Sequence, residues 1–118
     1  ITDTRKTTPL LRGLEKKAVR DGGGTNHRLN LNEFVLIKDN HIALAGGIGA
    51  AIKLISKVNP GFIEVEVQNL EQVREAVEHR VQRIMLDNMS DDEIAAAVRE
   101  IPSTIEIEAS GNMSLERV

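Results

Sequence analysis

Positively charged side chains gather in the first third of this chain, where they suit the recognition of a small organic anion. Arginine can grip a carboxylate through two parallel hydrogen bonds, whereas lysine offers a compact point charge. Residues 1–41 contain eight Lys and Arg against five Asp and Glu, and the remaining residues contain seven against thirteen. The first third could bind an organic anion and the acidic remainder a metal-bound phosphate, although ordinary surface charge would give the same counts.

A run of three glycines, Gly22 to Gly24, stands just before His27 and Arg28. Consecutive glycines allow a tight backbone whose N–H groups can point at an anion, and the His-Arg pair would suit a small, multiply charged ligand. The other interpretation is a flexible turn, which is the commoner outcome for an isolated Gly-Gly-Gly. The sequence leaves both interpretations open.

Residues 63–67 alternate strictly between branched and acidic side chains. Successive side chains of a strand point to opposite faces, so this pattern predicts a strand with Glu64 and Glu66 on one face. The face that carries these two glutamates must be exposed to solvent or paired with cations. Residues 104–108 alternate in the same way, and Glu64 or Glu106 could be a structural partner of inward-facing Lys and Arg side chains.

Polar residues follow each strand that the sequence predicts. They are Thr4-Arg5-Lys6, Lys38-Asp39-Asn40-His41, Glu66, Asp87-Asn88 and Ser110-Gly111. Taken singly, Lys38, Glu66 or Asp87 is more often a strand end that reaches water. Taken together they favour a functional site, because unrelated surface residues have no reason to fall at successive strand ends. In parallel α/β folds the carboxyl ends of the strands meet on one face, where active sites lie.

Composition excludes several classes of protein. The chain has no cysteine, so it can form neither a disulfide nor a Cys-ligated metal site. A net charge of −3 and the absence of Tyr and Trp argue against a nucleic-acid module. The longest uncharged run, residues 42–52, is much shorter than the roughly 18 apolar residues of a membrane span, and no signal peptide is visible. We therefore expect no nucleic-acid and no membrane partner.

The predicted elements alternate between strand and helix about five times. Strands are expected at 1–6, 34–37, 63–67, 84–86 and 104–108. Helices are expected from the Thr8-Pro9 cap to Ala18, around 48–55 before Asn59-Pro60-Gly61, after capping boxes at Asn69/Gln72 and Ser90/Glu93, and from Gly111 onward.

This alternation implies an α/β fold with a parallel sheet. The core must be aliphatic, because Phe34 and Phe62 are the only aromatic residues. An eight-fold barrel needs about 250 residues, so 118 residues in one domain could form only a partial (β/α) barrel of about five βα units. An open doubly wound sheet is the alternative, and the argument about strand ends holds for either fold.

Six motifs, in this order along the chain, resemble the barrel domain of quinolinate phosphoribosyltransferase, the carboxylating nicotinate-nucleotide pyrophosphorylase. They are Thr4-Arg5-Lys6-Thr7-Thr8-Pro9, Gly22-Gly23-Gly24-Thr25-Asn26-His27-Arg28, Leu36-Ile37-Lys38-Asp39-Asn40-His41, Glu64-Val65-Glu66-Val67, Met85-Leu86-Asp87-Asn88-Met89 and Glu108-Ala109-Ser110-Gly111. The resemblance implies that residues 1–118 are one partial TIM-barrel catalytic domain, and that the family's N-terminal domain and last barrel strands are absent from this sequence.

The resemblance also implies an activity. With Mg²⁺, members of this family transfer the phosphoribosyl group of phosphoribosyl pyrophosphate to quinolinate, giving nicotinate mononucleotide, pyrophosphate and CO₂ in NAD biosynthesis. Carried over by motif, the residues that would hold the quinolinate carboxylates are Arg5, His27, Arg28 and Lys38. Lys6 would be catalytic and lie between that acid and the phosphoribosyl group.

The remaining implied roles concern the phosphoribosyl group. Glu66 and Asp87 would be catalytic, facing the ribose and meeting Mg²⁺ through pyrophosphate, while Ser110 and Gly111 would lie near a phosphate. A carboxylate beside the ribose would stabilise the positive charge that develops on the sugar during transfer. The resemblance further implies a cytoplasmic enzyme that forms a dimer or a multiple of dimers.

Two alternatives stay open. The chain could be a non-catalytic partial barrel with at most weak anion binding, or a relative that acts on a different pyridine. One departure from the family is the stretch Glu78-His79-Arg80-Val81, where a small-residue turn containing glycine is usual. Without that glycine, the loop before the strand at Ile84 could be looser or differently shaped.

Overall fold

The sheet of this protein is parallel throughout, and its strands follow one another in chain order. Its strands are β1 (Val35–Ile37), β2 (Ile63–Val67), β3 (Arg83–Asp87) and β4 (Glu106–Ser110), in the order β1-β2-β3-β4. The computed structural model describes residues 1–59 and 61–118, which form two compact units, Ile1–Phe34 and Val35–Val118. The sheet belongs to the second unit.

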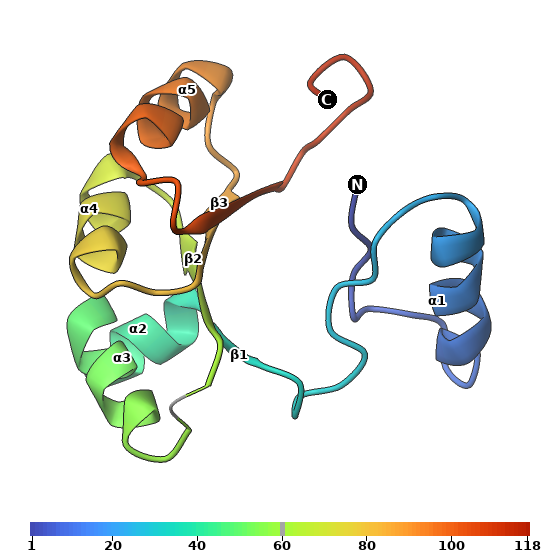
Figure 1. Ribbon diagram of the computed structural model, residues 1–118, viewed down its shortest axis with the longest axis horizontal. Coiled ribbons are helices and arrows are strands. Elements are labelled where there is room, and N and C mark those ends of the chain that lie inside the picture. Colours follow the sequence, from blue (N-terminus) through green and yellow to red (C-terminus); the bar gives the residue numbers. More distant parts are fainter. Residues whose placement is uncertain (60) are drawn as a thin grey trace. The chain divides into compact units, whose positions relative to one another are not determined.

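Within the second unit, the helices of the described residues cover one face of this sheet (Figure 1). They are α2 (Asp39–Ala45), α3 (Ile48–Ser56), α4 (Leu70–Glu78) and α5 (Asp91–Glu100). Helices on one face only are typical of a barrel wall, whereas a doubly wound sheet has them on both faces. The partial (β/α) barrel is therefore confirmed, and the doubly wound alternative is wrong.

The core lies between the sheet and these helices. Val65, Val67, Ile84 and Leu86 are fully buried there, packed with residues such as Val73 on α4. Burying a Val, Leu or Ile side chain contributes roughly 1.5–3 kcal/mol, so this aliphatic layer is the main stabilising feature of the second unit.

Strand register separates the two faces of the sheet as the alternating pattern predicts. Glu64 pairs with Arg83, and Arg83 pairs with Glu106 on the next strand. Glu66 likewise pairs with Met85, and Met85 with Glu108. The acidic residues therefore lie on the face opposite the aliphatic core.

The two predicted capping boxes have different outcomes. At α5, the Ser90 hydroxyl accepts the N–H of Glu93 and the Glu93 carboxylate accepts the N–H of Ser90, so this box is confirmed. At α4, Asn69 accepts the N–H of Gln72, but the Gln72 side chain accepts the N–H of Gln68 instead of completing the box.

The first unit is built on helix α1 (Arg12–Asp21). The expected strand at 1–6 is wrong, because only an isolated bridge between Thr2 and Thr25 is found there. The expected start at Thr8-Pro9 is also wrong. Leu10 has a φ of +68°, which no α-helix accommodates, so the helix begins two residues later.

Three further differences concern short segments. Helix α2 was not expected, because it follows β1 directly and the sequence shows only a polar strand end there. The helix expected after Gly111 is not present in the described residues, where turns follow β4 instead. Helix α3 ends at Ser56, before the predicted stop, and Pro60 of that stop lies outside the described residues.

Candidate active site

Lys38 and Glu66 form the best-defined contact at the carboxyl edge of the sheet. Lys38 directly follows β1 and Glu66 lies near the end of β2, and the Lys38 Nζ is 2.6 Å from the Glu66 Oε2. The Glu66 side chain is 11% exposed and that of Lys38 is 41% exposed. The pair therefore presents a solvent-accessible cation that a carboxylate holds in place.

Asp87 and Ser110 lie at the same edge, on the next two strands. They are register partners at the ends of β3 and β4, and the N–H of Asn88 donates to the Ser110 carbonyl at 2.9 Å. Gly111 follows with a φ of +79°, a backbone conformation that favours glycine. The parallel sheet thus brings together the predicted residues Lys38, Glu66, Asp87, Ser110 and Gly111.

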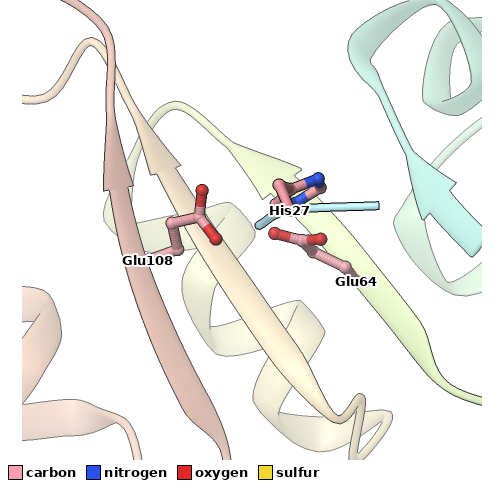
Figure 2. A group of neighbouring side chains, drawn as sticks. All are labelled: His27, Glu64 and Glu108. Atoms are coloured by element: carbon pink, nitrogen blue, oxygen red, sulfur yellow. The ribbon is translucent and has the colours of Figure 1, made fainter. Parts of the chain in front are cut away.

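Arg83 is a charged residue on the polar face that the sequence did not single out. Its guanidinium is 2.6 Å from the Glu106 carboxylate and 3.7 Å from those of Glu64 and Glu108, and it lies over the Phe62 ring. Figure 2 shows Glu64 and Glu108 projecting from β2 and β4 on the same side of the sheet. Arg83 is thus the cation that the acidic face required, and the structural role suggested for Glu64 and Glu106 is confirmed.

The position of Arg83 could have been found from the sequence. It directly precedes the buried run Ile84-Met85-Leu86, and the flanking strands each carry alternating glutamates. Aligning the three strands by their alternation places Arg83 between Glu64 and Glu106, as the register does.

His27 and Arg28 belong to the first unit, where both are buried. The His27 ring meets the Phe34 ring edge-on at a centroid distance of 5.1 Å, and the Arg28 guanidinium lies 5.7 Å from the Phe34 centroid. Arg28 Nη1 also donates to the Phe34 carbonyl at 3.2 Å. These contacts restrict the rotamers of His27 and Arg28. Both side chains are therefore held in place before any ligand binds.

A buried lysine lies beneath this pair. Lys16 is 2% exposed, and its ammonium donates to Asp3 at 2.7 Å, to the His27 carbonyl at 2.8 Å and to the Arg28 carbonyl at 3.3 Å. Asp3 also accepts the N–H of His27 at 2.7 Å. Lys16 and Asp3 thus fix the backbone that carries His27 and Arg28, and nothing in the sequence pattern signals either residue.

Arg5 and Lys6 are exposed in the first unit. The N–H of Lys6 donates to the Thr4 hydroxyl at 3.2 Å. The bridge between Thr2 and Thr25 brings the segment that carries Arg5 and Lys6 next to the segment that carries His27. Four of the predicted site residues, Arg5, Lys6, His27 and Arg28, therefore come from two adjoining segments of this unit.

The glycine run ends helix α1. The N–H groups of Gly22, Gly23 and Gly24 donate to carbonyls of Ala18, Arg20 and Val19 at 2.9–3.0 Å. A Cβ on Gly24 would lie 2.9 Å from the Val19 side chain, so glycine is needed for close packing. The turn interpretation is confirmed, and the interpretation as an anion-binding loop is wrong because these N–H groups are already used.

The donor set at the carboxyl edge fits Mg²⁺, which prefers oxygen ligands and commonly binds through one or two carboxylates plus substrate phosphates. Asp87 and Glu66 are such carboxylates. Because Glu66 is already paired with Lys38, Asp87 is the better placed of the two.

A polar cavity of about 470 Å³ adjoins this edge, beyond β3 and β4. Asn88, Asn112 and Arg117 are among its lining residues, and the Arg117 guanidinium donates to Asp91 and to the Asn112 and Met89 carbonyls. A second cavity, of about 410 Å³, lies beside β1 and is lined mostly by aliphatic side chains. Its apolar lining is unsuited to a dicarboxylate or a diphosphate.

No helix in the described residues is long and apolar enough to cross a membrane.

Comparison with known proteins agrees with this geometry. The sequence model of the family described as "Quinolinate phosphoribosyl transferase, C-terminal domain" matches residues 1–118. A probable nicotinate-nucleotide pyrophosphorylase (carboxylating) of Synechocystis is 52% identical over 96% of this chain and 40% of the relative. The corresponding Bacillus subtilis protein is 48% identical over 98% of this chain and 41% of the relative.

Solved structures give the same result. NadC from Streptococcus pyogenes superposes with a TM-score of 0.91 and 48% identity over 96% of this chain and 40% of that chain. The nicotinate-nucleotide pyrophosphorylase from Francisella tularensis gives a TM-score of 0.92 and 42% identity over 98% of this chain and 41% of that chain. The chain thus spans about two fifths of the length of these relatives, and it belongs to the family of the quinolinate phosphoribosyltransferase C-terminal domain.

Proposed function

We propose that this protein transfers the phosphoribosyl group of phosphoribosyl pyrophosphate to quinolinate and releases pyrophosphate and CO₂, giving nicotinate mononucleotide. The observation that carries the proposal is the arrangement of Lys38, Glu66, Asp87 and the Ser110-Gly111 turn along one edge of a parallel sheet. The names of the relatives, nicotinate-nucleotide pyrophosphorylase and quinolinate phosphoribosyltransferase, support the same reaction.

Quinolinate would be held by cations. It carries two adjacent carboxylates, and Arg5, His27, Arg28 and Lys38 would be their partners. Arginine provides bidentate hydrogen bonds and lysine a point charge, so the set suits a dianion better than a monoanion. Lys6 would lie between quinolinate and the phosphoribosyl group.

Carboxylates would assist the transfer itself. As the bond to pyrophosphate breaks, positive charge develops on the ribose, and a nearby Glu66 or Asp87 would stabilise it. Asp87 would hold Mg²⁺ together with pyrophosphate oxygens, and bound Mg²⁺ neutralises charge on the leaving group. The proposal requires no protein nucleophile, because the quinolinate nitrogen attacks the sugar carbon directly.

Loss of CO₂ would follow the transfer. Formation of the N-glycosidic bond makes the ring nitrogen cationic, and this positive charge would stabilise the carbanion left on the adjacent ring carbon when its carboxylate departs as CO₂. That carbon would then take up a proton from water. Detection of a decarboxylated free pyridine before transfer would contradict this order.

The proposal has a wider part that rests on the resemblance. It includes Mg²⁺ as the cofactor, assembly into dimers and a cytoplasmic location. It also includes a single catalytic domain formed by residues 1–118, the same residues that the family model matches.

A second candidate is a partial barrel that binds anions without turnover. It is favoured by one observation, that the chain spans about 40% of the length of its relatives. Residues outside these 118 would then be needed for catalysis.

The test is an assay of the purified protein with quinolinate, phosphoribosyl pyrophosphate and Mg²⁺, measuring nicotinate mononucleotide and CO₂. We expect equimolar products, and a loss of about 100-fold or more in kcat/KM in Lys38→Met. The control is Lys53→Met, which removes an exposed lysine of α3 and should leave kcat/KM unchanged. A folded protein that binds quinolinate without forming product would favour the second candidate.

A further inference from the structure

Asn88 lies between two groups that the proposed function uses, the Asp87 carboxylate and the Ser110-Gly111 turn. The proposed function gives Asn88 itself no role. Asn88 follows Asp87 at the end of β3, and its neighbour across the sheet is Ser110-Gly111, where β4 ends and a turn begins. Its φ is +56°, the left-handed conformation that asparagine tolerates better than most residues do.

The hydrogen bonds of Asn88 reach both groups. Its Nδ2 donates to the Asp87 Oδ2 at 2.9 Å, and its backbone N–H donates to the Ser110 carbonyl at 2.9 Å. Its Oδ1 accepts from the Asn112 Nδ2 at 3.0 Å. One residue therefore contacts the Asp87 carboxylate and residues on both sides of Gly111.

Packing against Gly111 is closer still. A Cβ added to Gly111 would lie 2.3 Å from the Asn88 Oδ1 and 2.5 Å from its Cγ, distances that real Cβ atoms essentially never reach. Gly111 itself has a φ of +79°. The amide of Asn88 thus occupies the space that a side chain at position 111 would need, and the two residues constrain each other.

We propose that Asn88 is a positioning residue that holds the Asp87 carboxylate and the Ser110-Gly111 turn in one fixed arrangement for the phosphoribosyl pyrophosphate side of the site. This inference rests on the proposed function. Its chemical basis is that Asp87 and the turn must meet one ligand together, the metal-bound pyrophosphate and a phosphate of the same molecule. A shift of about 1 Å between such groups can lower a rate by about 100-fold.

Asn88→Gly is the informative variant, because glycine adopts a positive φ readily and keeps the backbone N–H that donates to Ser110. It removes only the amide. Arg80→Gly is a matched control, since Arg80 also has a positive φ, of 53°, and lies before β3, at the amino end of that strand. Both variants change the entropy of the unfolded chain in the same way.

The first readout compares the two substrates in the same protein. In Asn88→Gly we expect kcat/KM for phosphoribosyl pyrophosphate to fall by about 10- to 100-fold relative to Arg80→Gly, with the affinity for quinolinate unchanged within about two-fold. Equal kcat/KM in the two glycine variants would overturn the inference. A proportional loss for both substrates with a lowered Tm would also overturn it, because that pattern indicates a structural role.

The second readout does not depend on turnover. Gly111→Ala should lower Tm, and we expect this loss to shrink by at least about half when Asn88→Gly is also present, since the contact with the amide is then gone. Equal losses in the two backgrounds would contradict the coupling. If the protein fails to convert quinolinate, the proposed function fails, whereas this cycle still decides whether Asn88 constrains the turn.

Discussion

At the scale of single residues, Lys16 shows how a buried charge can serve a site that it does not touch. Taking an ammonium out of water is costly unless it is paired and hydrogen-bonded, and Lys16 has a carboxylate and two carbonyls as partners. Two of those partners are the backbone carbonyls of His27 and Arg28. The free-energy cost of burying Lys16 is thus offset by hydrogen bonds. The same hydrogen bonds fix the backbone of His27 and Arg28, the two residues proposed to bind quinolinate.

Lys16→Met should lower the free energy of unfolding by about 3 kcal/mol, because it leaves the Asp3 carboxylate, which is only 11% exposed, without its cation. Urea denaturation of both variants and the wild type measures this. The control is Lys17→Met, since Lys17 is 62% exposed and its ion pair with Asp21 lies on the surface, where such pairs contribute little. Equal losses in the two variants would show that the buried pair has no special role.

Residue types at strand ends could be predicted from the sequence, but their partners could not. The positions of Lys38, Glu66, Asp87 and Ser110 follow from where apolar runs stop, which is a local property. The long-range contacts of Lys16 and Asn88 join residues that lie 11 to 24 positions apart, and they depend on packing that local patterns do not report.

At the scale of elements, the capping box of α5 couples a helix start to pH. The Ser90 hydroxyl and then the Ser90 N–H donate to the Glu93 carboxylate, and these hydrogen bonds lower the pKa of Glu93. A lowered pKa in the folded state means that the charged carboxylate stabilises the fold. This stabilisation is fully present above the unfolded value, about 4.3, and is lost as pH falls through the folded value.

Glu93→Gln should therefore lower Tm at pH 7 and lose most of that effect below the ordinary pKa of a glutamate, about 4.3. Thermal unfolding followed by circular dichroism between pH 3 and about pH 7 measures the difference from wild type. Asp92→Asn, in the same helical turn, controls for the loss of a charge near the helix N-terminus. A Tm difference for Glu93→Gln that stays constant with pH would contradict the role of the carboxylate.

Elements with a strong pattern were predicted well, and the errors have local causes. The strands at 63–67 and 84–86 match β2 and most of β3, because strict alternation and a buried run are unambiguous. Helix α2 is short, and the ring of His41 accepts the Lys38 N–H at 3.1 Å at its start, a cap that the sequence does not signal. The stretch Glu78-His79-Arg80-Val81 was expected to be looser or differently shaped, because it lacks the glycine that the resemblance implies. Arg80 in this stretch takes the left-handed conformation, so a turn still ends helix α4.

At the scale of the whole molecule, the sheet is the feature that makes a site possible. Its helix-covered face is apolar and buried, whereas its other face carries Arg83 and the glutamates that surround it. A parallel sheet is normally covered on both faces, and in a barrel the side chains of the inner face fill the interior while the site lies at the carboxyl ends of the strands. The alternating glutamates predicted this face, but the two compact units could not be predicted from the order of elements.

The proposed function as a whole depends on recognition of a dicarboxylate. Calorimetric titration of quinolinate into the purified protein tests it most directly, with nicotinic acid, which lacks the second carboxylate, as the comparison ligand. We predict that quinolinate binds and that nicotinic acid binds at least about 30-fold more weakly, since one buried charge pair contributes about 2 kcal/mol or more. Arg28→Ala should abolish quinolinate binding, while Arg99→Ala, which removes an arginine from the exposed side of α5, should not. Equal affinities for the two acids, or quinolinate binding that survives Arg28→Ala, would contradict the proposed site.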